Sequence, residues 1–256
     1  MKIAIPSHHR VEQLKKKTLK LLLKHGFSED DIYIFVAPEC YEMYVNEFKN
    51  VILSRDSICA KRNHIIEYFP EGERIVEMDD DVEDILHTKK DEKNYPVENL
   101  KDFYEENFNM LRGEVPQKWN GDAPKGLWGM NANTNQYFAT GEDKHKIQLC
   151  SICNTTLGYF NHKDIKLTVP EKEDFERVIQ YYLAGIPILK RCGYGIKTKY
   201  WNNKGGLEKQ YDMDERKRKQ RQSADILKER YPELVYQRER KNGIVDIRFR
   251  IKNNKN

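Results

Sequence analysis

The sequence contains no apolar run that approaches the length of a membrane span, and its first residues form too short an apolar stretch for a signal peptide. Its five cysteines are odd in number and scattered, which gives no disulfide framework. Cys150 and Cys153 form a C-x-x-C inside an apolar run, without a second Cys or His pair at matching spacing. We therefore expect buried structural thiols, a reducing cytoplasmic location and no membrane partner.

No internal repeat divides the chain, whose 256 residues suffice for one large domain or for a domain with an appendage. Hydrophobic residues make up 38% and charged residues 34%, which is typical of a soluble protein with a widely solvated surface. The charge is uneven: 14 basic and 7 acidic residues lie from Asp214 to the end, whereas the whole chain carries only +4. This basic segment indicates either a polyanionic partner or a solvated charged helix.

The first 82 residues alternate between strand-like and helix-like segments. Apolar β-prone runs occur at 2–5, 31–36, 51–53 and 74–78, with helical patterns between them at 11–25, 40–48 and 56–69. This order predicts an α/β fold with a mostly parallel central sheet flanked by helices. Because ligands bind outside the carboxyl ends of parallel strands, the polar residues that follow these strands should gather along one edge.

The second half has a more mixed pattern. We expect helices at 97–112, 170–184 and 214–230, and a Gly- and Pro-rich loop at 113–126. Strands are expected at 127–133, 147–160, 186–189, 194–201 and 244–251.

Three consecutive carboxylates, Asp79, Asp80 and Asp81, end the fourth predicted strand. Adjacent like charges repel, so this triplet indicates either a divalent cation or simply an acidic loop that stops the strand. Asp79 and Asp81 are two residues apart, and on an extended chain they would point the same way and hold Mg²⁺ or Mn²⁺ together. We expect Asp81 to be the surest ligand, and Asp80 to face a ribose or a backbone amide.

Several short motifs in this order resemble those of GT-A glycosyltransferases. They are 60–63 (AKRN) before the acidic triplet, 128–131 (WGMN), 135–138 (NQYF), 173–176 (EDFE) and 198–200 (TKY) before Gly205 and Gly206. The pattern is similar to one subgroup, the enzymes associated with the TET/JBP base hydroxylases, which includes phage and base J glycosyltransferases. The resemblance implies a GT-A (Rossmann-like) domain at 1–210, with a nucleotide-sugar half at 1–82, a mixed acceptor half at 83–210 and a basic extension at 211–256.

The donor-binding candidates follow the first two predicted strands and one helix. Arg10 and Arg62 carry guanidinium groups that match a diphosphate, although Arg62 can equally form a salt bridge with the acidic triplet. By the resemblance, Glu39 would accept from the nucleoside, and Ser7 and the main chain near Pro6 would serve similarly. Each of these positions is otherwise an ordinary strand-end turn.

Glu173 and Asp174 begin a predicted helix, where acidic residues also favour the helix dipole. The resemblance favours catalysis instead, with Asp174 taking the proton from the acceptor hydroxyl and inverting the anomeric centre. Gly205 and Gly206 either bring backbone N–H groups close to a phosphate or sugar, or form a simple loop. The seven histidines show no metal-ligand spacing.

Together these features predict an Mg²⁺- or Mn²⁺-dependent enzyme that moves a hexose, glucose by the resemblance, from a UDP-sugar to a hydroxymethylated pyrimidine in DNA. The modified base would have to leave the stack to reach the donor. The resemblance points to a bacteriophage protein in a bacterial cytoplasm. Three alternatives remain open: a GT-A transferase acting on a saccharide or a protein, an inactive module that only binds nucleic acid, and a metal-dependent nucleotidyl enzyme.

Overall fold

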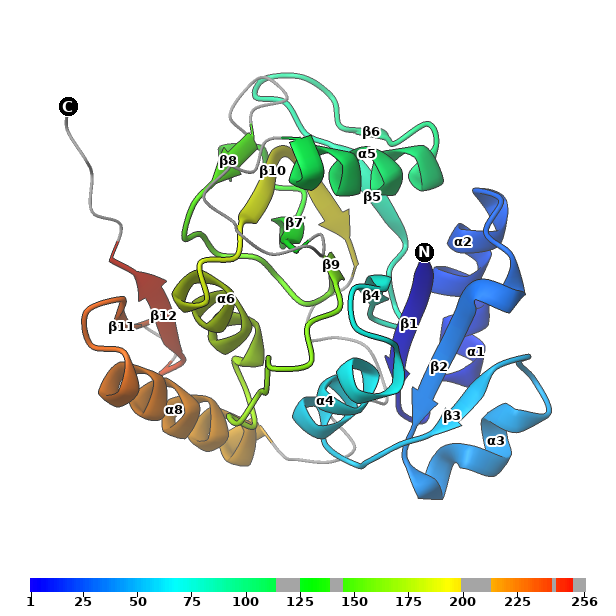
Figure 1. Ribbon diagram of the computed structural model, residues 1–256, viewed down its shortest axis with the longest axis horizontal. Helices are drawn as coiled ribbons and strands as arrows, with labels where there is room; N and C mark the ends of the chain where they lie inside the picture. Colours follow the sequence, from blue (N-terminus) through cyan, green and yellow to red (C-terminus); the bar gives the residue numbers. More distant parts are fainter. Residues whose placement is uncertain (114–124, 139–144, 199–212, 241–242, 251–256) are drawn as a thin grey trace.

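The computed structural model describes residues 1–113, 125–138, 145–198, 213–240 and 243–250. It is an α/β structure whose main sheet has ten strands, nine of them in the order β3-β2-β1-β4-β9-β7-β10-β5-β6, with β8 paired to β10 (Figure 1). Helices cover both faces of this sheet. The predicted fold class is therefore confirmed. Of the helices that the structure describes, none has the length and apolarity that a bilayer span requires.

Four parallel strands form the first half of the sheet: β1 (Lys2–Ser7), β2 (Ile32–Val36), β3 (Val51–Leu53) and β4 (Arg74–Met78). The helices between them are α1 (Val11–Leu14), α2 (Lys20–Lys24), α3 (Tyr41–Val45) and α4 (Ile58–Tyr68). A π-helical turn, Lys15–Leu19, joins α1 to α2. The Ser57 hydroxyl caps α4 by accepting a hydrogen bond from the Ala60 amide at 3.1 Å. All four strand predictions in this half are confirmed.

The second half adds antiparallel and mixed pairings. Its strands are β5 (Asp84–His87), β6 (Tyr95–Pro96), β7 (Leu127–Asn131), β8 (His145–Ile147), β9 (Thr156–Phe160) and β10 (Ile188–Lys197). Its helices are α5 (Leu100–Gly113) and α6 (Glu173–Leu183). Strand β9 runs antiparallel to β4 and thereby joins the two halves.

The strand predictions at 147–160, 186–189 and 194–201 were wrong in their extent. Residues 148–155 leave the sheet between β8 and β9, because they carry the Thr155 carbonyl to the Asp79 amide after β4 and the Asn154 side chain to Glu173 of α6. Residues 188–197 form one strand with a bulge between Arg191 and Gly195. A side chain at Gly195 would lie 2.3 Å from the Asn133 carbonyl oxygen, so only glycine allows β10 to pass there. Strands β5 and β6 were not predicted.

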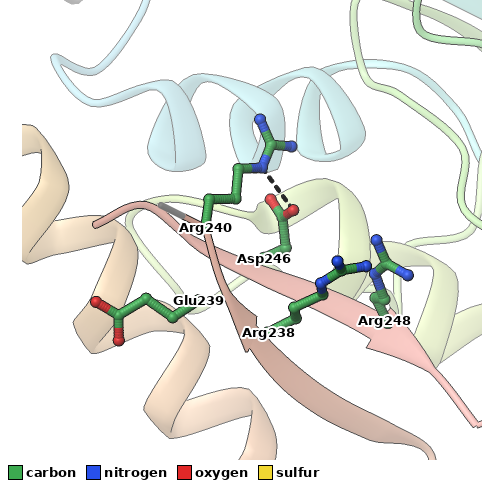
Figure 2. A pocket seen from close by; sticks show the side chains of 5 residues that line it. All are labelled: Arg238, Glu239, Arg240, Asp246 and Arg248. Carbon is green, nitrogen blue, oxygen red and sulfur yellow. Dashed lines mark hydrogen bonds and ion pairs between the residues drawn. The ribbon is translucent and has the colours of Figure 1, made fainter. Parts of the chain in front are cut away.

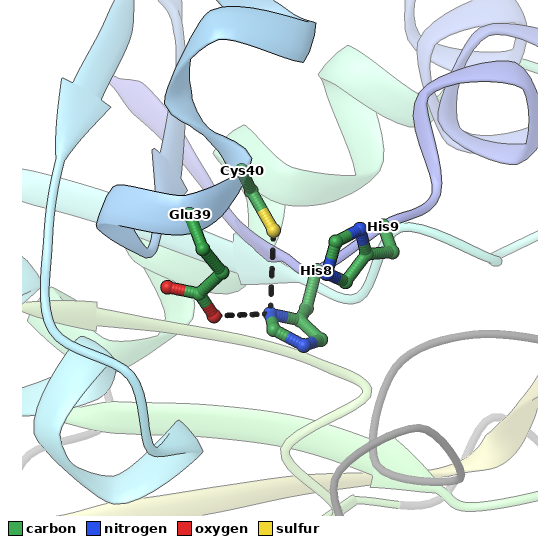
Figure 3. Close-up of side chains that lie close together, drawn as sticks. All are labelled: His8, His9, Glu39 and Cys40. Atoms are coloured by element: carbon green, nitrogen blue, oxygen red, sulfur yellow. Dashed lines mark hydrogen bonds and ion pairs between the residues drawn. The ribbon is translucent and has the colours of Figure 1, made fainter.

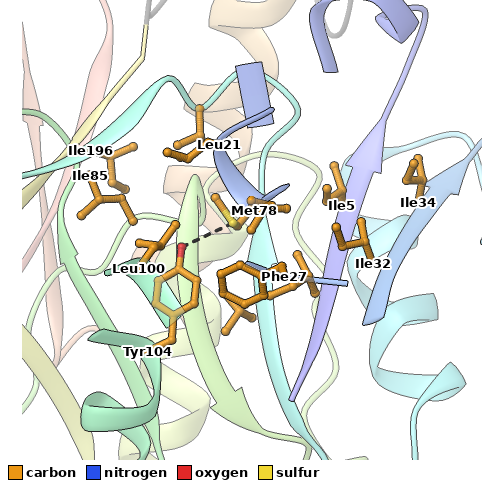
Figure 4. Close-up of a cluster of buried hydrophobic side chains, with 14 of the residues drawn as sticks. Ile5, Leu21, Phe27, Ile32, Ile34, Met78, Ile85, Leu100, Tyr104 and Ile196 are labelled. Atoms are coloured by element: carbon orange, nitrogen blue, oxygen red, sulfur yellow. Dashed lines mark hydrogen bonds between the residues drawn. The ribbon is translucent and has the colours of Figure 1, made fainter. Parts of the chain in front are cut away.

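Alternate residues of the first strands point into two cores, one on each face of the sheet. Ile3 and Ile5 pack with α1, α2 and α5, and part of this cluster is drawn in Figure 4. Ala4 and Phe35 pack on the opposite face with α4 and α6. The sheet is therefore buried on both faces, as continuous apolar strands predict.

The C-terminal segment packs against the rest of the chain. Helix α8 (Met213–Arg230) and the hairpin of β11 (Val235–Glu239) and β12 (Val245–Phe249) share a third apolar cluster with Ile179 of α6. Figure 1 shows α8 lying beside α6. The predicted basic helix is confirmed, and the predicted terminal strand is paired with β11, which was not predicted.

Candidate functional site

The acidic triplet lies where β1 and β4 end. The Ser7 hydroxyl donates a hydrogen bond to the Asp80 carboxylate at 2.6 Å, and the Arg10 guanidinium donates to the same carboxylate at 2.9 Å. The Arg10 group also lies 3.4 Å from the Asp81 carboxylate. Asp80 therefore joins the end of β4 to the residues at and after the end of β1, and its contact with a ribose or a backbone amide stays a prediction.

The three carboxylates do not alternate along an extended chain. Strand β4 ends at Met78, and Asp80 and Asp81 lie in a turn, so Asp79 and Asp81 face different partners. The buried Thr18 hydroxyl fixes this turn, because it donates to the Asp79 carbonyl at 2.8 Å and accepts from the Val82 amide at 3.0 Å. The expectation that Asp79 and Asp81 point the same way was therefore wrong, since it required a strand to continue through the triplet.

Arg62 is the centre of a buried ionic network and is only 2% exposed. Its guanidinium lies 2.6 Å from the carboxylate of Glu77, 3.1 Å from that of Asp79 and 3.2 Å from that of Glu173. The sequence left two roles open for Arg62, and this geometry corresponds to the salt bridge with the acidic triplet. Arg62 thus joins the end of β4 to the first residue of α6.

Glu77 completes this network from within β4. It is fully buried, and its carboxylate accepts from Arg62 at 2.6 Å, from Arg177 at 2.7 Å and from the Tyr159 hydroxyl at 2.6 Å. Burial alone would raise the pKa of Glu77, but Arg177 and Arg62 more than offset it and hold the pKa below its usual value. Sequence reasoning missed both Glu77 and Arg177, although a glutamate inside an apolar strand was a usable signal.

Asp174 differs from its neighbour Glu173 in its surroundings. Glu173 is held by Arg62 and by the Asn154 amide, both at 3.2 Å, whereas Asp174 accepts from the Phe175 amide at 3.0 Å. Burial, followed by the charge of Glu173, raises the pKa of Asp174 to about 7. Lys172, directly before this pair, has a left-handed backbone with φ of 60°. Such strain in a non-glycine residue often accompanies a functional position.

The triplet offers a divalent cation the right type of ligand atom. Five carboxylates, those of Glu77, Asp79, Asp80, Asp81 and Glu173, gather around the guanidinium groups of Arg10, Arg62 and Arg177. Burial raises the pKa of Asp79 to about 7 even though Arg62 opposes the shift. Carboxylate oxygens are the ligands that Mg²⁺ and Mn²⁺ prefer.

The remaining predicted residues are only partly brought together. Pro6 is buried in β1, and Glu39 lies after β2 with an exposed side chain, 3.5 Å from the His8 ring. Gly205 and Gly206 lie outside the described residues. Trp128 belongs to the core, where it is fully buried. The five cysteines are all free thiols.

Neither a known protein family nor a curated protein matches the sequence. Solved structures, in contrast, match this chain in fold. TarS from S. aureus (residues 1–349, in complex with UDP-GlcNAc) matches with a TM-score of 0.50 at 14% identity, over 89% of this chain and 67% of that one. The same TarS segment without ligand gives a TM-score of 0.48 at 15% identity, over 76% of this chain and 60% of that one. The α/β architecture matches a GT-A glycosyltransferase fold.

Proposed function

We propose that this chain is a glycosyltransferase that moves a hexose from a UDP-sugar to the hydroxyl of a hydroxymethylated pyrimidine in DNA. The observation that carries the transfer reaction is the position of Arg62, which holds Asp79 and Glu173 within 3.2 Å of one guanidinium. We infer from this contact that the carboxylates proposed to bind the metal and the diphosphate act together with the start of α6, which carries the proposed base Asp174. The GT-A architecture supports the same reading.

Asp174 is the proposed general base. It takes the proton from the acceptor hydroxyl as that oxygen attacks the anomeric carbon. The bond from this carbon to the diphosphate oxygen breaks on the opposite face, so UDP leaves and the configuration inverts. A carboxylate with a pKa of about 7 is poised for this step, because it is largely ionised at slightly alkaline pH and still accepts a proton readily.

Asp81 is the proposed protein ligand of Mg²⁺ or Mn²⁺, and Asp79 would join it through a change of side-chain rotamer, because the two carboxylates face different partners here. When bound, the metal would neutralise the charge that develops on the leaving diphosphate. Arg10 lies 2.9 Å from Asp80 and 3.4 Å from Asp81, so its guanidinium is held at the same edge, where it can orient an oxyanion. The Ser7 hydroxyl donates a hydrogen bond to the Asp80 carboxylate and thereby fixes the position of that carboxylate at the same edge.

The proposed DNA surface is the outer face of the C-terminal hairpin. Its side chains surround a cavity lined by Arg238, Glu239, Arg240, Asp246 and Arg248 (Figure 2). Asp246 neutralises Arg240 at 2.6 Å, whereas Arg238 and Arg248 are exposed. The hairpin packs on α8, which lies beside α6, the helix that carries Asp174, so phosphates bound here would hold an acceptor near the site.

A product assay tests the transfer reaction. The protein is incubated with Mn²⁺, with UDP-glucose or UDP-GlcNAc, and with DNA containing 5-hydroxymethylcytosine or 5-hydroxymethyluracil, and the nucleosides are analysed by mass spectrometry. We expect a hexose added to one modified base and none to unmodified DNA. Donor binding without transfer to any modified DNA would refute the DNA acceptor and favour a saccharide or protein acceptor. No binding of either donor would refute the transferase itself.

Charge reversal tests the DNA surface better than truncation does, because removing α8 and the hairpin would expose the apolar cluster on α6. Replacing Arg238 and Arg248 by Glu should weaken DNA binding and reduce the dependence of affinity on salt concentration. The matched control replaces the exposed Lys20 and Lys24 of α2, on the far side of the molecule, by Glu. Equal losses in both variants would assign the effect to net charge and refute this surface.

A further inference from the structure

A second cluster of ligand-type side chains lies at the carboxyl ends of β1 and β2. His8 and His9 directly follow β1, and Glu39 and Cys40 lie in the 3-10 turn after β2. The two strands are parallel and pair Ser7 with Val36, so their ends bring the four residues together (Figure 3). Among the described residues, these four form a group of potential metal ligands whose ligand atoms all lie within 4.8 Å of one another.

The distances within the cluster suit a tetrahedral ion. The Nδ1 atom of His8 lies 3.5 Å from the Cys40 sulfur and 3.5 Å from a Glu39 carboxylate oxygen. Zinc bonds of about 2.0 Å to nitrogen or oxygen and about 2.3 Å to sulfur imply ligand separations of roughly 3.3–3.5 Å at the tetrahedral angle. Two edges of the tetrahedron are therefore already close to their final length.

The backbone of His9 holds the fourth group in place at an energetic cost. His9 has a left-handed φ of 54°, a conformation that costs a non-glycine residue about 1 kcal/mol or more. It brings the His9 ring to 4.5 Å from the His8 ring, measured between centroids.

We propose that His8, His9, Glu39 and Cys40 form a binding site for a borderline transition metal of the Zn²⁺ class. Two imidazoles, a thiolate and a carboxylate are the ligand types of tetrahedral zinc sites, whereas Mg²⁺ and Mn²⁺ favour oxygen alone. The site is therefore chemically distinct from the acidic triplet. Binding converts the Cys40 thiol to a thiolate and releases its proton to solvent, with no change of oxidation state.

Cobalt spectroscopy of the full chain tests the site without any sugar donor. Metal-free protein is titrated with Co²⁺, which reports a thiolate ligand by a charge-transfer band in the near ultraviolet and tetrahedral geometry by intense visible absorption. We expect both signals at one equivalent and their loss when one equivalent of Zn²⁺ is added. Co²⁺ bound by the oxygen ligands of the triplet gives neither signal, so failure of the transferase proposal and failure of this one are distinguishable.

The variants assign the ligands. Cys40→Ser should abolish the charge-transfer band, while the matched control Cys153→Ser, outside the cluster, should retain it. Because Cys40 is fully buried, His9→Gln and Glu39→Gln provide variants at less buried positions, and each should weaken Zn²⁺ binding by about tenfold or more. Absence of the charge-transfer band in the unaltered protein, its survival in Cys40→Ser, or unchanged zinc affinity in both His9→Gln and Glu39→Gln would overturn the proposal.

Discussion

Replacing Glu77 by Leu should destabilise the protein far more than replacing a hydrogen-bonded residue on the surface would. Glu77 has no exposed area, and its carboxylate faces two guanidinium groups, those of Arg62 at 2.6 Å and Arg177 at 2.7 Å. Leucine fills a similar volume but leaves Arg177 buried with no carboxylate at that position. The main cost is therefore an uncompensated buried charge rather than a cavity.

The expected magnitude follows from that burial. Breaking a buried ion pair by removing one partner costs about 3–5 kcal/mol. For a chain of this size, each kcal/mol lowers the melting temperature by roughly 2–4 °C, so Glu77→Leu should lower it by about 6–20 °C. The double variant Glu77→Leu with Arg177→Leu removes the stranded charge. It should be more stable than the sum of the two single effects by about 1–3 kcal/mol.

Urea unfolding of the four proteins in this double-mutant cycle measures the coupling energy. The pKa of Glu77 is lowered in the folded state, so its stabilising contribution is present above its unfolded value near 4.5 and is lost as the pH falls through the lower folded value. The coupling should accordingly be constant near neutral pH and shrink in acid. A cost below about 1 kcal/mol for Glu77→Leu, or a cycle that is additive within about 0.5 kcal/mol, would refute the reasoning.

The remaining predictions concern the proposed site. Asp174→Asn should abolish transfer yet retain UDP binding, and kcat of the unaltered enzyme should fall as the pH drops below about 7. Because the folded pKa of Asp174 is raised, its ionisation lowers stability as the pH rises from about 4 to 7, so Asp174→Asn should unfold at a higher temperature than the unaltered protein at pH 8. Asp81→Asn should raise the Mn²⁺ concentration needed for half-maximal activity, whereas Asp81→Glu should restore part of the affinity. Thr18→Val, which removes both hydrogen bonds to the turn after β4, should weaken UDP-sugar binding, and an unchanged Kd in calorimetry would count against its role.

The first half of the fold was predictable because its strands are buried on both faces. Residues 32–36 are a continuous apolar run, and 74–78 are apolar apart from Arg74 and Glu77; both segments are bounded by turn residues and are short for a helix. The second half was harder because its strands are defined by tertiary contacts. Part of the segment 148–155 is as apolar as a typical strand. These residues nevertheless leave the sheet, where their groups form hydrogen bonds with Asp79 and Glu173.

The candidate site was predictable only where chemistry and strand order coincided. Arg62 lies beside the acidic triplet because its helix, α4, is joined by a short turn to β4, the strand that the triplet follows. Arg177 lies 100 residues from Glu77 in sequence, and no spacing rule connects them. Likewise, His8 and Cys40 are 32 residues apart and meet because two parallel strands end side by side.

The division of roles within the acidic triplet explains why three carboxylates stand in a row. Asp79 faces Arg62 and, through it, the helix of Asp174, whereas Asp80 faces Ser7 and Arg10 and closes the end of β1 onto β4. Asp81 accepts from the Thr198 hydroxyl at 3.0 Å and thereby contacts the residue that follows β10. Each carboxylate therefore joins β4 to a different element. A single acid at this strand end could bind a cation, but it could not hold three elements around it.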